Sequence, residues 1–213
     1  GGWRERLDAA WPALAPVCGA SPYLASLARR APDRVGDLLA CEPDDRFADL
    51  RARTEQAGRL ATDEAGPELR RLKAEAHLLI ALCDLGGVWD LDAVTGALTR
   101  FADTSIAAAL RAAAAAEVEA GRLRTVGEGR DGPVPGWFCL AMGKQGAYEL
   151  NYSSDVDISV FYEPERLPVA EGVEPRAFAV RLTQALAGLM QDRTGEGYVF
   201  RGDLRPRPPP SAP

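Results

Sequence analysis

A glycine-containing turn that leads into a pair of aspartates restricts the fold of this chain more than any other feature. Residues 143–146 form the turn, and they follow the apolar run 137–142. Asp155 comes directly before the segment 156–162 and Asp157 lies within it; the β-branched and apolar residues of this segment predict a strand. Side chains alternate between the two faces of a strand, so we expect Asp155 and Asp157 to point the same way.

Two carboxylates on one face of a buried strand predict a metal site. They repel each other and are costly to desolvate, and a divalent cation with oxygen ligands removes that cost. Asp203 lies among apolar residues and arginines in a further predicted strand, 198–205. Three carboxylates can hold two ions about 3.5–4 Å apart and clamp the attacking and leaving oxygens of an in-line displacement. We expect Asp155 and Asp157 to bridge two Mg²⁺ ions, with Mn²⁺ as the alternative, and Asp203 to complete the site or act as a base.

Other residues near these aspartates are suited to binding phosphate. Main-chain N–H groups of the turn could hold phosphate oxygens before a short helix, with added charge from Lys144. Guanidinium groups bind tetrahedral oxyanions through two hydrogen bonds, which makes the arginines after Asp203 candidates for a second anion such as inorganic phosphate. The candidate nucleotide- and phosphate-binding residues are Gly143, Lys144, Gly146, Ser154, Arg205 and Arg207.

Each of these features also has a plainer structural explanation. A pair of aspartates one residue apart on a strand arises often by chance, and glycines commonly serve tight turns. Arg205 and Arg207 can simply pair with Asp203 or with surface acids. The metal hypothesis therefore depends on the order and spacing of the whole set.

Composition and charge narrow the function classes. The chain has 213 residues, of which 46% are apolar and 26% charged, as in a globular protein. No apolar run approaches the ~20 residues that span a bilayer, and we expect no secretory signal peptide. A net charge of −6 argues against a nucleic-acid surface, which needs Lys and Arg to neutralise phosphates. Cys83 and Cys139 lie in apolar surroundings and are expected to be reduced thiols, which predicts a cytoplasmic location.

The first 124 residues show helical patterning. Ser21 followed by Pro22 predicts a helix start, and Pro32 stops that helix. The clearest predicted helix covers residues 68–85, and Gly86 and Gly87 end it, as a left-handed C-terminal cap requires. Predicted helices cover residues 22–31, 68–85, 91–100, 104–122 and 176–193. His77, inside the second of them, is interpreted as an ordinary packing residue.

The order of strand, glycine turn, aspartate-bearing strand, helix and strand with aspartate resembles the nucleotidyltransferase superfamily of polymerase-β type. Three blocks, residues 143–146, 149–157 and 203–208, are similar to the glutamine synthetase adenylyltransferase family. Residues 21–24 and the helix from residue 69 are similar to the helical lead-in of that family. The chain departs from the family pattern where Gln145 and Ala147 replace a leucine and a glycine, and where Pro206 replaces a leucine.

This resemblance implies an α+β chain in two parts. Residues 1–128 would form a helical N-terminal region. Residues 129–213 would form a palm like that of polymerase β, a small mixed sheet with helices on one side that carries the glycine turn and both aspartate strands. Family members contain two such modules, and their domain continues well beyond the counterpart of residue 213. We therefore expect the palm to be incomplete in this chain.

The resemblance also implies metal-dependent nucleotidyl transfer that regulates glutamine synthetase in nitrogen metabolism. The sequences of residues 150–155 and 197–201 are similar to those of the adenylyl-removing module, in which phosphate displaces AMP from a tyrosine and ADP is formed. Expected partners are adenylylated glutamine synthetase, inorganic phosphate, ADP or ATP, and a regulatory signal-transduction protein. Two alternatives stay open. The site could transfer AMP from ATP to a protein tyrosine or a small-molecule hydroxyl, or the chain could be a non-catalytic regulatory or docking fragment.

Overall fold

The computed structural model describes residues 2–128, 132–195 and 197–206, with the backbone alone for Trp3, Arg6, Val17, Ala20 and residues 203–206. Helices come first: α1 (Gly2–Ala20), α2 (Pro22–Arg30), α3 (Pro32–Leu38), α4 (Pro43–Ala57), α5 (Thr62–Leu85) and α6 (Leu91–Glu119). The remainder contains β1 (Trp137–Ala141), α7 (Gly143–Gly146), β2 (Val156–Tyr162), the short 3₁₀ helix η1 (Pro164–Arg166), α8 (Pro175–Gln191) and β3 (Gly202–Pro206). No helix in the described ranges is long and apolar enough to cross a membrane.

Local sequence signals set several of the helix ends. The Ser21 hydroxyl accepts a hydrogen bond from the N–H of Leu24 at 3.3 Å and caps α2, as predicted. Pro32 both follows the end of α2 and begins α3. Gly87 has a φ of 64° after the end of α5, the left-handed conformation expected for a helix stop at this position.

Two of the predicted helix boundaries were wrong. The helices expected over residues 91–100 and 104–122 form a single helix, α6, because nothing between them breaks the backbone pattern. Phe101 and Ala102 point into the core, and the Thr104 hydroxyl donates to the Arg100 carbonyl one turn back at 2.7 Å. Helix α5 begins at Thr62 rather than residue 68, with Pro67 inside it.

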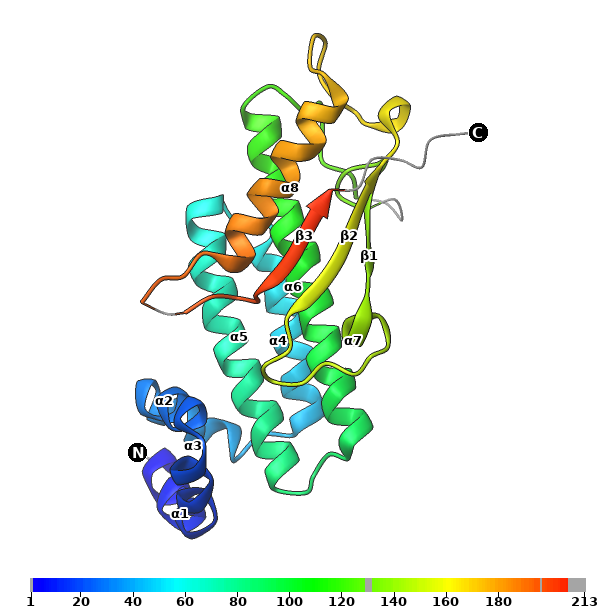
Figure 1. The fold of residues 1–213 in the computed structure, drawn as a ribbon. Coiled ribbons are helices and arrows are strands. Elements are labelled where there is room, and N and C mark those ends of the chain that lie inside the picture. The colour runs from blue at the N-terminus through cyan, green and yellow to red at the C-terminus, as the bar shows by residue number, and fades with distance from the viewer. Residues whose placement is uncertain (1, 129–131, 196, 207–213) are drawn as a thin grey trace.

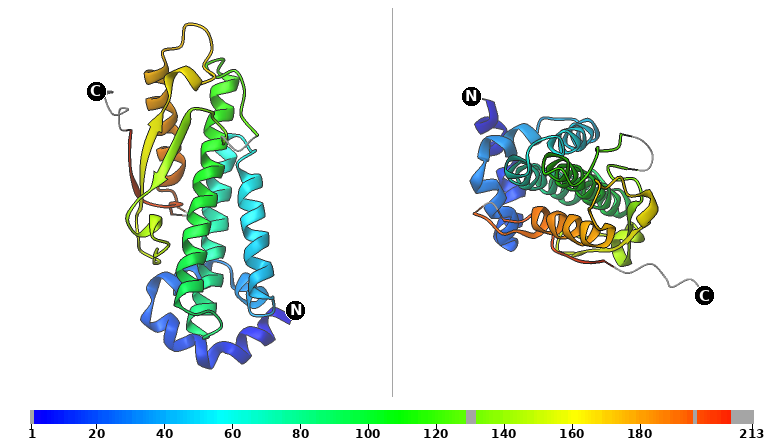
Figure 2. Two further views of the ribbon diagram at one scale, coloured as in Figure 1. Left: turned by 90° about the vertical axis from the view of Figure 1, so that its right-hand side faces the viewer. Right: turned by 90° about the horizontal axis from the view of Figure 1, so that it is seen from above.

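The sheet is mixed and lies to one side of the helices. Its order is β1-β2-β3, with β1 and β2 antiparallel and β2 and β3 parallel. Helix α8 provides the crossover between the parallel strands, and α8 and α6 cover one face of the sheet (Figures 1 and 2). The predicted α+β class, with a small mixed sheet and helices on one side, is confirmed.

One hydrophobic cluster runs through both halves of the chain. It includes Phe101 on α6, Phe178 and Leu182 on α8, and Val160 on β2, all fully buried. The helices and the sheet therefore share a continuous core, which fixes the face of the sheet that remains open.

Two predictions about the strands need correction. The continuous apolar run 137–142 favours a strand that is covered on both faces, but in β1 Phe138 is 43% exposed and Leu140 is 50% exposed. Helices α6 and α8 lie on the opposite face of the sheet (Figures 1 and 2). The third strand was expected to begin at residue 198, but it begins at Gly202, because Val199 and Phe200 both donate their N–H groups to the Met190 carbonyl at the end of α8.

A strand over residues 198–205 would place consecutive side chains on opposite faces, and the first part of this segment does not do so. Val199 and Phe200 are consecutive and both buried, which a regular strand with one open face does not allow. Gly202 is required where β3 starts, since a Cβ there would lie 2.3 Å from the Val156 carbonyl oxygen.

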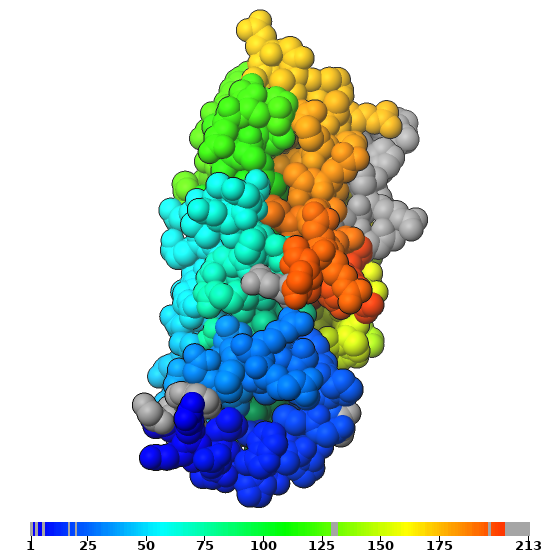
Figure 3. Space-filling model, turned by 90° about the vertical axis from the view of Figure 1, so that its left-hand side faces the viewer, coloured from blue at the N-terminus to red at the C-terminus, as the bar shows by residue number. Residues whose placement is uncertain are grey.

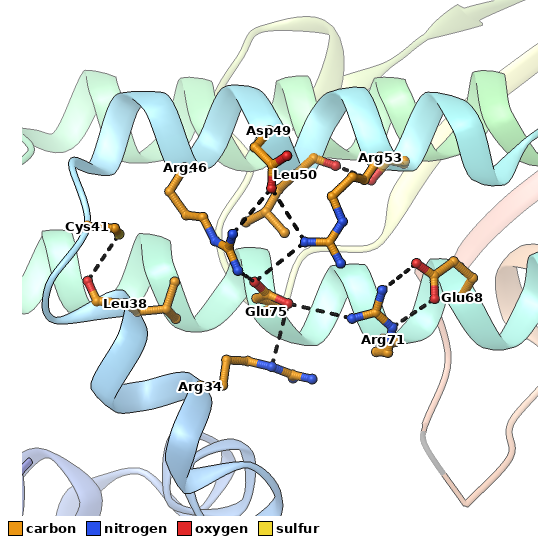
Figure 4. A network of polar contacts seen from close by, with 11 residues as sticks. Arg34, Leu38, Cys41, Arg46, Asp49, Leu50, Arg53, Glu68, Arg71 and Glu75 are labelled. Carbon is orange, nitrogen blue, oxygen red and sulfur yellow. Dashed lines mark hydrogen bonds and ion pairs between the residues drawn. The ribbon is translucent and has the colours of Figure 1, made fainter. Parts of the chain in front are cut away.

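The N-terminal helices pack across one end of the molecule. Figure 3 shows α1–α3 as a continuous mass against the end of the longer helices. Close to this contact lies Glu75 of α5, a buried carboxylate surrounded by four arginines (Figure 4). The arginines are Arg34 from α3, Arg46 and Arg53 from α4, and Arg71 from α5. This network joins three helices through one side chain.

Candidate active site

Positions 157 and 203 lie side by side on the face of the sheet that α6 and α8 do not cover. Val156, Ile158 and Val160 of β2 are buried against the helices, so Asp157 projects from the opposite face, where its side chain is exposed. Asp157 pairs with Asp203 in the parallel register of β2 and β3. Paired positions of a parallel ladder belong to the same face of the pleat, which places positions 157 and 203 together on the outer face.

Asp155 is linked to the segment that leads into β3. It precedes β2, and its Oδ1 lies 2.9 Å from Nε of Arg201 in an ion pair. A second nitrogen of Arg201, Nη2, donates to the Ser153 carbonyl at 3.3 Å, and the N–H of Val156 donates to the Arg201 carbonyl at 2.8 Å. The structure therefore places positions 157 and 203 side by side through strand register, and it connects Asp155 to the segment before β3 through Arg201.

The glycine turn packs against Asp157. It forms the short helix α7, in which Gly143 has a φ of 53°. A Cβ at Gly143 would lie 3.3 Å from Oδ2 of Asp157, and the N–H of Met142 donates to the Asp157 carbonyl at 2.8 Å. The N–H of Gly146 is already used, because it donates to the Met142 carbonyl at 3.1 Å. Of the phosphate-binding N–H groups expected in the turn, this one is unavailable.

Gln145 ties the turn to the helical half. Its side chain is buried, and Nε2 donates to Oδ1 of Asp103 on α6 at 2.7 Å. Sequence reasoning missed Asp103, although the replacement of an apolar residue by Gln145 was a signal that a polar partner lay nearby. Lys144 of the same turn is exposed, and the Ser154 hydroxyl accepts from the N–H of Asn151 at 3.1 Å.

Two cations that sequence reasoning did not assign to the site lie over one aromatic ring. Nζ of Lys73 is 5.1 Å from the centroid of Tyr198, and Cζ of Arg201 is 5.8 Å from the same centroid. Tyr23 and Phe200 complete an aromatic cage around Lys73. Burial of the amine, together with the charge of Arg201, lowers the pKa of Lys73 to about 8.

His77 lies in the interior beside this cage. Its Nδ1 is 3.2 Å from the hydroxyl of Tyr23, and its ring packs against Tyr152 and Phe200. Burial, with a smaller effect of the Lys73 charge, holds the pKa of His77 well below its ordinary value. A neutral ring at this place is in keeping with the packing role that we assigned to it.

The oxygen donors present suit a hard cation. Asp157 makes no hydrogen bond or ion pair with any side chain that the structure describes, so its carboxylate is open to a ligand. Mg²⁺ and Mn²⁺ prefer carboxylate oxygens, which Asp155 and Asp157 supply. Within the described side chains no group of three His, Cys, Asp or Glu could hold a metal. The side chains of Asp203 and Arg205, and the whole of Arg207, lie outside the described part.

Comparison with known proteins gives a consistent result across the chain. The family model for glutamate-ammonia ligase adenylyltransferase matches residues 11–213. A bifunctional glutamine synthetase adenylyltransferase/adenylyl-removing enzyme of Caulobacter vibrioides is 57% identical over 208 residues, which is 97% of this chain and 21% of that protein. Proteins with the same description from Bradyrhizobium sp. (strain ORS 278) and Rhodopseudomonas palustris (strain TIE-1) are 46% and 50% identical over 213 and 204 residues, covering 98% and 94% of this chain.

These relatives are much longer than the chain described here. The matched part makes up 22% of the Bradyrhizobium protein and 20% of the Rhodopseudomonas protein. The chain thus spans about a fifth of the length of the curated relatives that it matches.

Proposed function

Because the chain belongs to the glutamate-ammonia ligase adenylyltransferase family, we propose that it carries the carboxylate site of an adenylyl-transfer module that acts on glutamine synthetase. The observation that carries this proposal is the pairing of Asp157 with Asp203 on the open face of the sheet, beside the glycine turn. The names of the relatives supply the substrate class, glutamine synthetase, and both directions of the reaction.

We propose that the reaction is phosphorolytic removal of AMP. An oxygen of inorganic phosphate forms a bond to the adenylyl phosphorus, and the bond from that phosphorus to the tyrosine oxygen breaks. ADP and tyrosine are released, and the proton that the attacking phosphate loses to water balances the proton that the tyrosine oxygen takes up. Asp155, Asp157 and Asp203 would hold two Mg²⁺ ions, which supply positive charge to the oxygens of the transferred group. Lys144 would contact the phosphates of the nucleotide, and Arg205 and Arg207 would bind the attacking phosphate.

The reverse direction is the second candidate, and the relatives' names favour it equally, since they include adenylyltransferase as well as adenylyl removal. In that direction ATP would give AMP to a tyrosine hydroxyl and release pyrophosphate. A non-catalytic docking fragment is the third candidate, which requires no metal binding.

The first experiment is an assay of the chain with adenylylated glutamine synthetase, Mg²⁺ and phosphate, in which ADP is measured. ADP that depends on added phosphate supports removal, whereas pyrophosphate from ATP and unmodified glutamine synthetase supports the reverse reaction. Asp157→Asn should lower the rate at least about a hundredfold, because it weakens a metal site that stabilises the transition state. Asp63→Asn, an exposed change in the first turn of α5, is the matched control and should leave the rate unchanged.

Calorimetric titration with Mg²⁺ tests the site without requiring turnover. The unmodified chain should bind the ion and Asp157→Asn should not. Equal binding by the two proteins, or neither product in either direction of the assay, would refute the proposed function.

A further inference from the structure

We propose that Arg201 guards Asp155: its guanidinium occupies the carboxylate before a metal ion binds and then turns to an oxyanion of the substrate. This inference rests on the proposed function, because it assumes that Asp155 is a metal ligand. It gives Arg201 a role in the order of binding at the site.

The first step of the argument is competition for one oxygen. Nε of Arg201 lies 2.9 Å from Oδ1 of Asp155, so this oxygen already has a cationic partner. The side chains are 57% and 54% exposed, respectively. Exposed ion pairs of this kind contribute little free energy, so a divalent cation can displace the guanidinium at low cost.

The second step is that displaced Arg201 cannot move far. Its carbonyl accepts a hydrogen bond from Val156 at the start of β2, which holds its backbone beside the site. Its guanidinium carbon also lies 5.8 Å from the centroid of the Tyr198 ring, a surface on which a freed guanidinium can rest. The side chain therefore remains within its own length of Asp155.

The third step is the excess of positive charge at this place. Lys73 lies over the same Tyr198 ring, and no carboxylate of the described residues forms an ion pair with it. Once Arg201 has left Asp155, its guanidinium group and the Lys73 amine would both lie over the Tyr198 ring with no carboxylate paired to either of them among the described residues. A tetrahedral oxyanion is the complementary ligand, and guanidinium binds it through two hydrogen bonds. Inorganic phosphate and the phosphates of a nucleotide both have this chemistry.

The competing explanation is that Arg201 is only a structural strap. It joins the loop at Ser153 to the segment before β3, and such a strap would keep Asp155 in place for the metal. The two explanations predict opposite effects of removing the guanidinium. A guard should give tighter metal binding when it is removed, and a strap should give weaker binding.

The test measures Mn²⁺ binding to the whole chain by electron paramagnetic resonance, in the absence of nucleotide. Arg201→Gln should bind Mn²⁺ about two- to fivefold more tightly than the unmodified chain, the range that an exposed ion pair can supply. Arg176→Gln removes an exposed arginine at the start of α8, at the other end of the sheet (Figure 1), and controls for net charge; its affinity should not change.

The second arm measures anion binding at saturating Mn²⁺, with inorganic phosphate and ADP titrated separately. Arg201→Gln should weaken at least one of them about tenfold, and Arg201→Lys should recover only part of the loss, because an ammonium group lacks the planar fork. A loss confined to phosphate assigns Arg201 to the attacking anion, and a loss confined to ADP assigns it to the nucleotide.

Mn²⁺ affinity of Arg201→Gln that is equal to or weaker than that of the unmodified chain overturns the inference, as does unchanged affinity for both anions. If Asp157→Asn loses Mn²⁺ while Arg201→Gln behaves like the unmodified chain, only the inference fails. If the unmodified chain binds no Mn²⁺, or Asp157→Asn keeps its affinity, the proposed metal site fails with it.

Discussion

Among single residues, Lys73 shows how the fold changes the acid–base chemistry of a side chain. A lysine within a long helix is expected to be exposed. In α5, however, the Lys73 amine lies among the rings of Tyr23, Tyr198 and Phe200. Burial disfavours the charged amine, which is why its pKa falls from 10.5 to about 8. The rings offset part of that cost through cation–π attraction.

The free energy of unfolding should therefore rise with pH over the range in which Lys73 is deprotonated in the folded chain but still protonated in the unfolded chain. The folded pKa lies below the unfolded one, so between about pH 8 and 10.5 the unfolded chain binds the extra proton and folding gains as pH increases. Tyr23 acts in the opposite sense above about pH 10, since its pKa is raised to about 12. We expect a gain of about 2–3 kcal/mol between pH 7 and 10 relative to Lys73→Met, which lacks this titration.

Urea unfolding of both proteins at several pH values measures that difference and cancels the titrations that they share. Lys144→Met, which removes the exposed lysine, should follow the pH dependence of the unmodified chain. Parallel curves for the unmodified chain and Lys73→Met would show that the amine is not buried in this way.

Among the elements, the contact of α3, α4 and α5 depends on one acidic side chain. Glu75 is 3% exposed and lies within 4.0 Å of four guanidinium groups. Burial of a carboxylate is tolerable only with such partners, and the loss of its charge would leave the arginines facing one another.

Glu75→Gln should therefore lower the free energy of unfolding by about 3–5 kcal/mol, the usual cost of breaking a buried ion pair by removing one partner. Glu68→Gln is the matched control, because Glu68 is a more exposed partner of Arg71 alone and should cost less than about 1 kcal/mol. Equal costs in urea denaturation would mean that the network adds nothing beyond a surface pair.

At the scale of the whole molecule, the helical half and the sheet share one core. Phe178 of α8 is fully buried between them, so its removal leaves a cavity that both parts line. Phe178→Ala should cost about 3–5 kcal/mol, whereas Phe138→Ala, on the open face of the sheet, should cost much less.

Hydrogen exchange should show that the two halves respond together. Amides of α6 and of β2 are expected to lose protection by the same free energy in Phe178→Ala, because they unfold as one cooperative unit. Loss confined to β2 would indicate that the sheet unfolds independently of the helices.

The sequence alone was enough wherever structure depends on neighbouring residues. The cap at Ser21, the end of α5 at its glycines and the strand β2 follow from hydrogen bonds and backbone preferences within a few positions. Local patterns gave a wrong prediction at α6, where they indicated a break that the structure does not have. They were also wrong at residues 198–201, where N–H groups that a strand would have paired donate to the end of α8.

Only the tertiary structure decided which distant residues meet. The register of β2 with β3 brings Asp157 beside Asp203, and helix packing brings Lys73 and Arg201 to one ring. No local pattern encodes these meetings, because register and helix packing are settled by burial of the whole core, and a shift of one residue would turn every side chain to the other face. The sequence was enough to identify the candidate acidic residues, whereas only the packed fold showed that Arg201 forms an ion pair with Asp155.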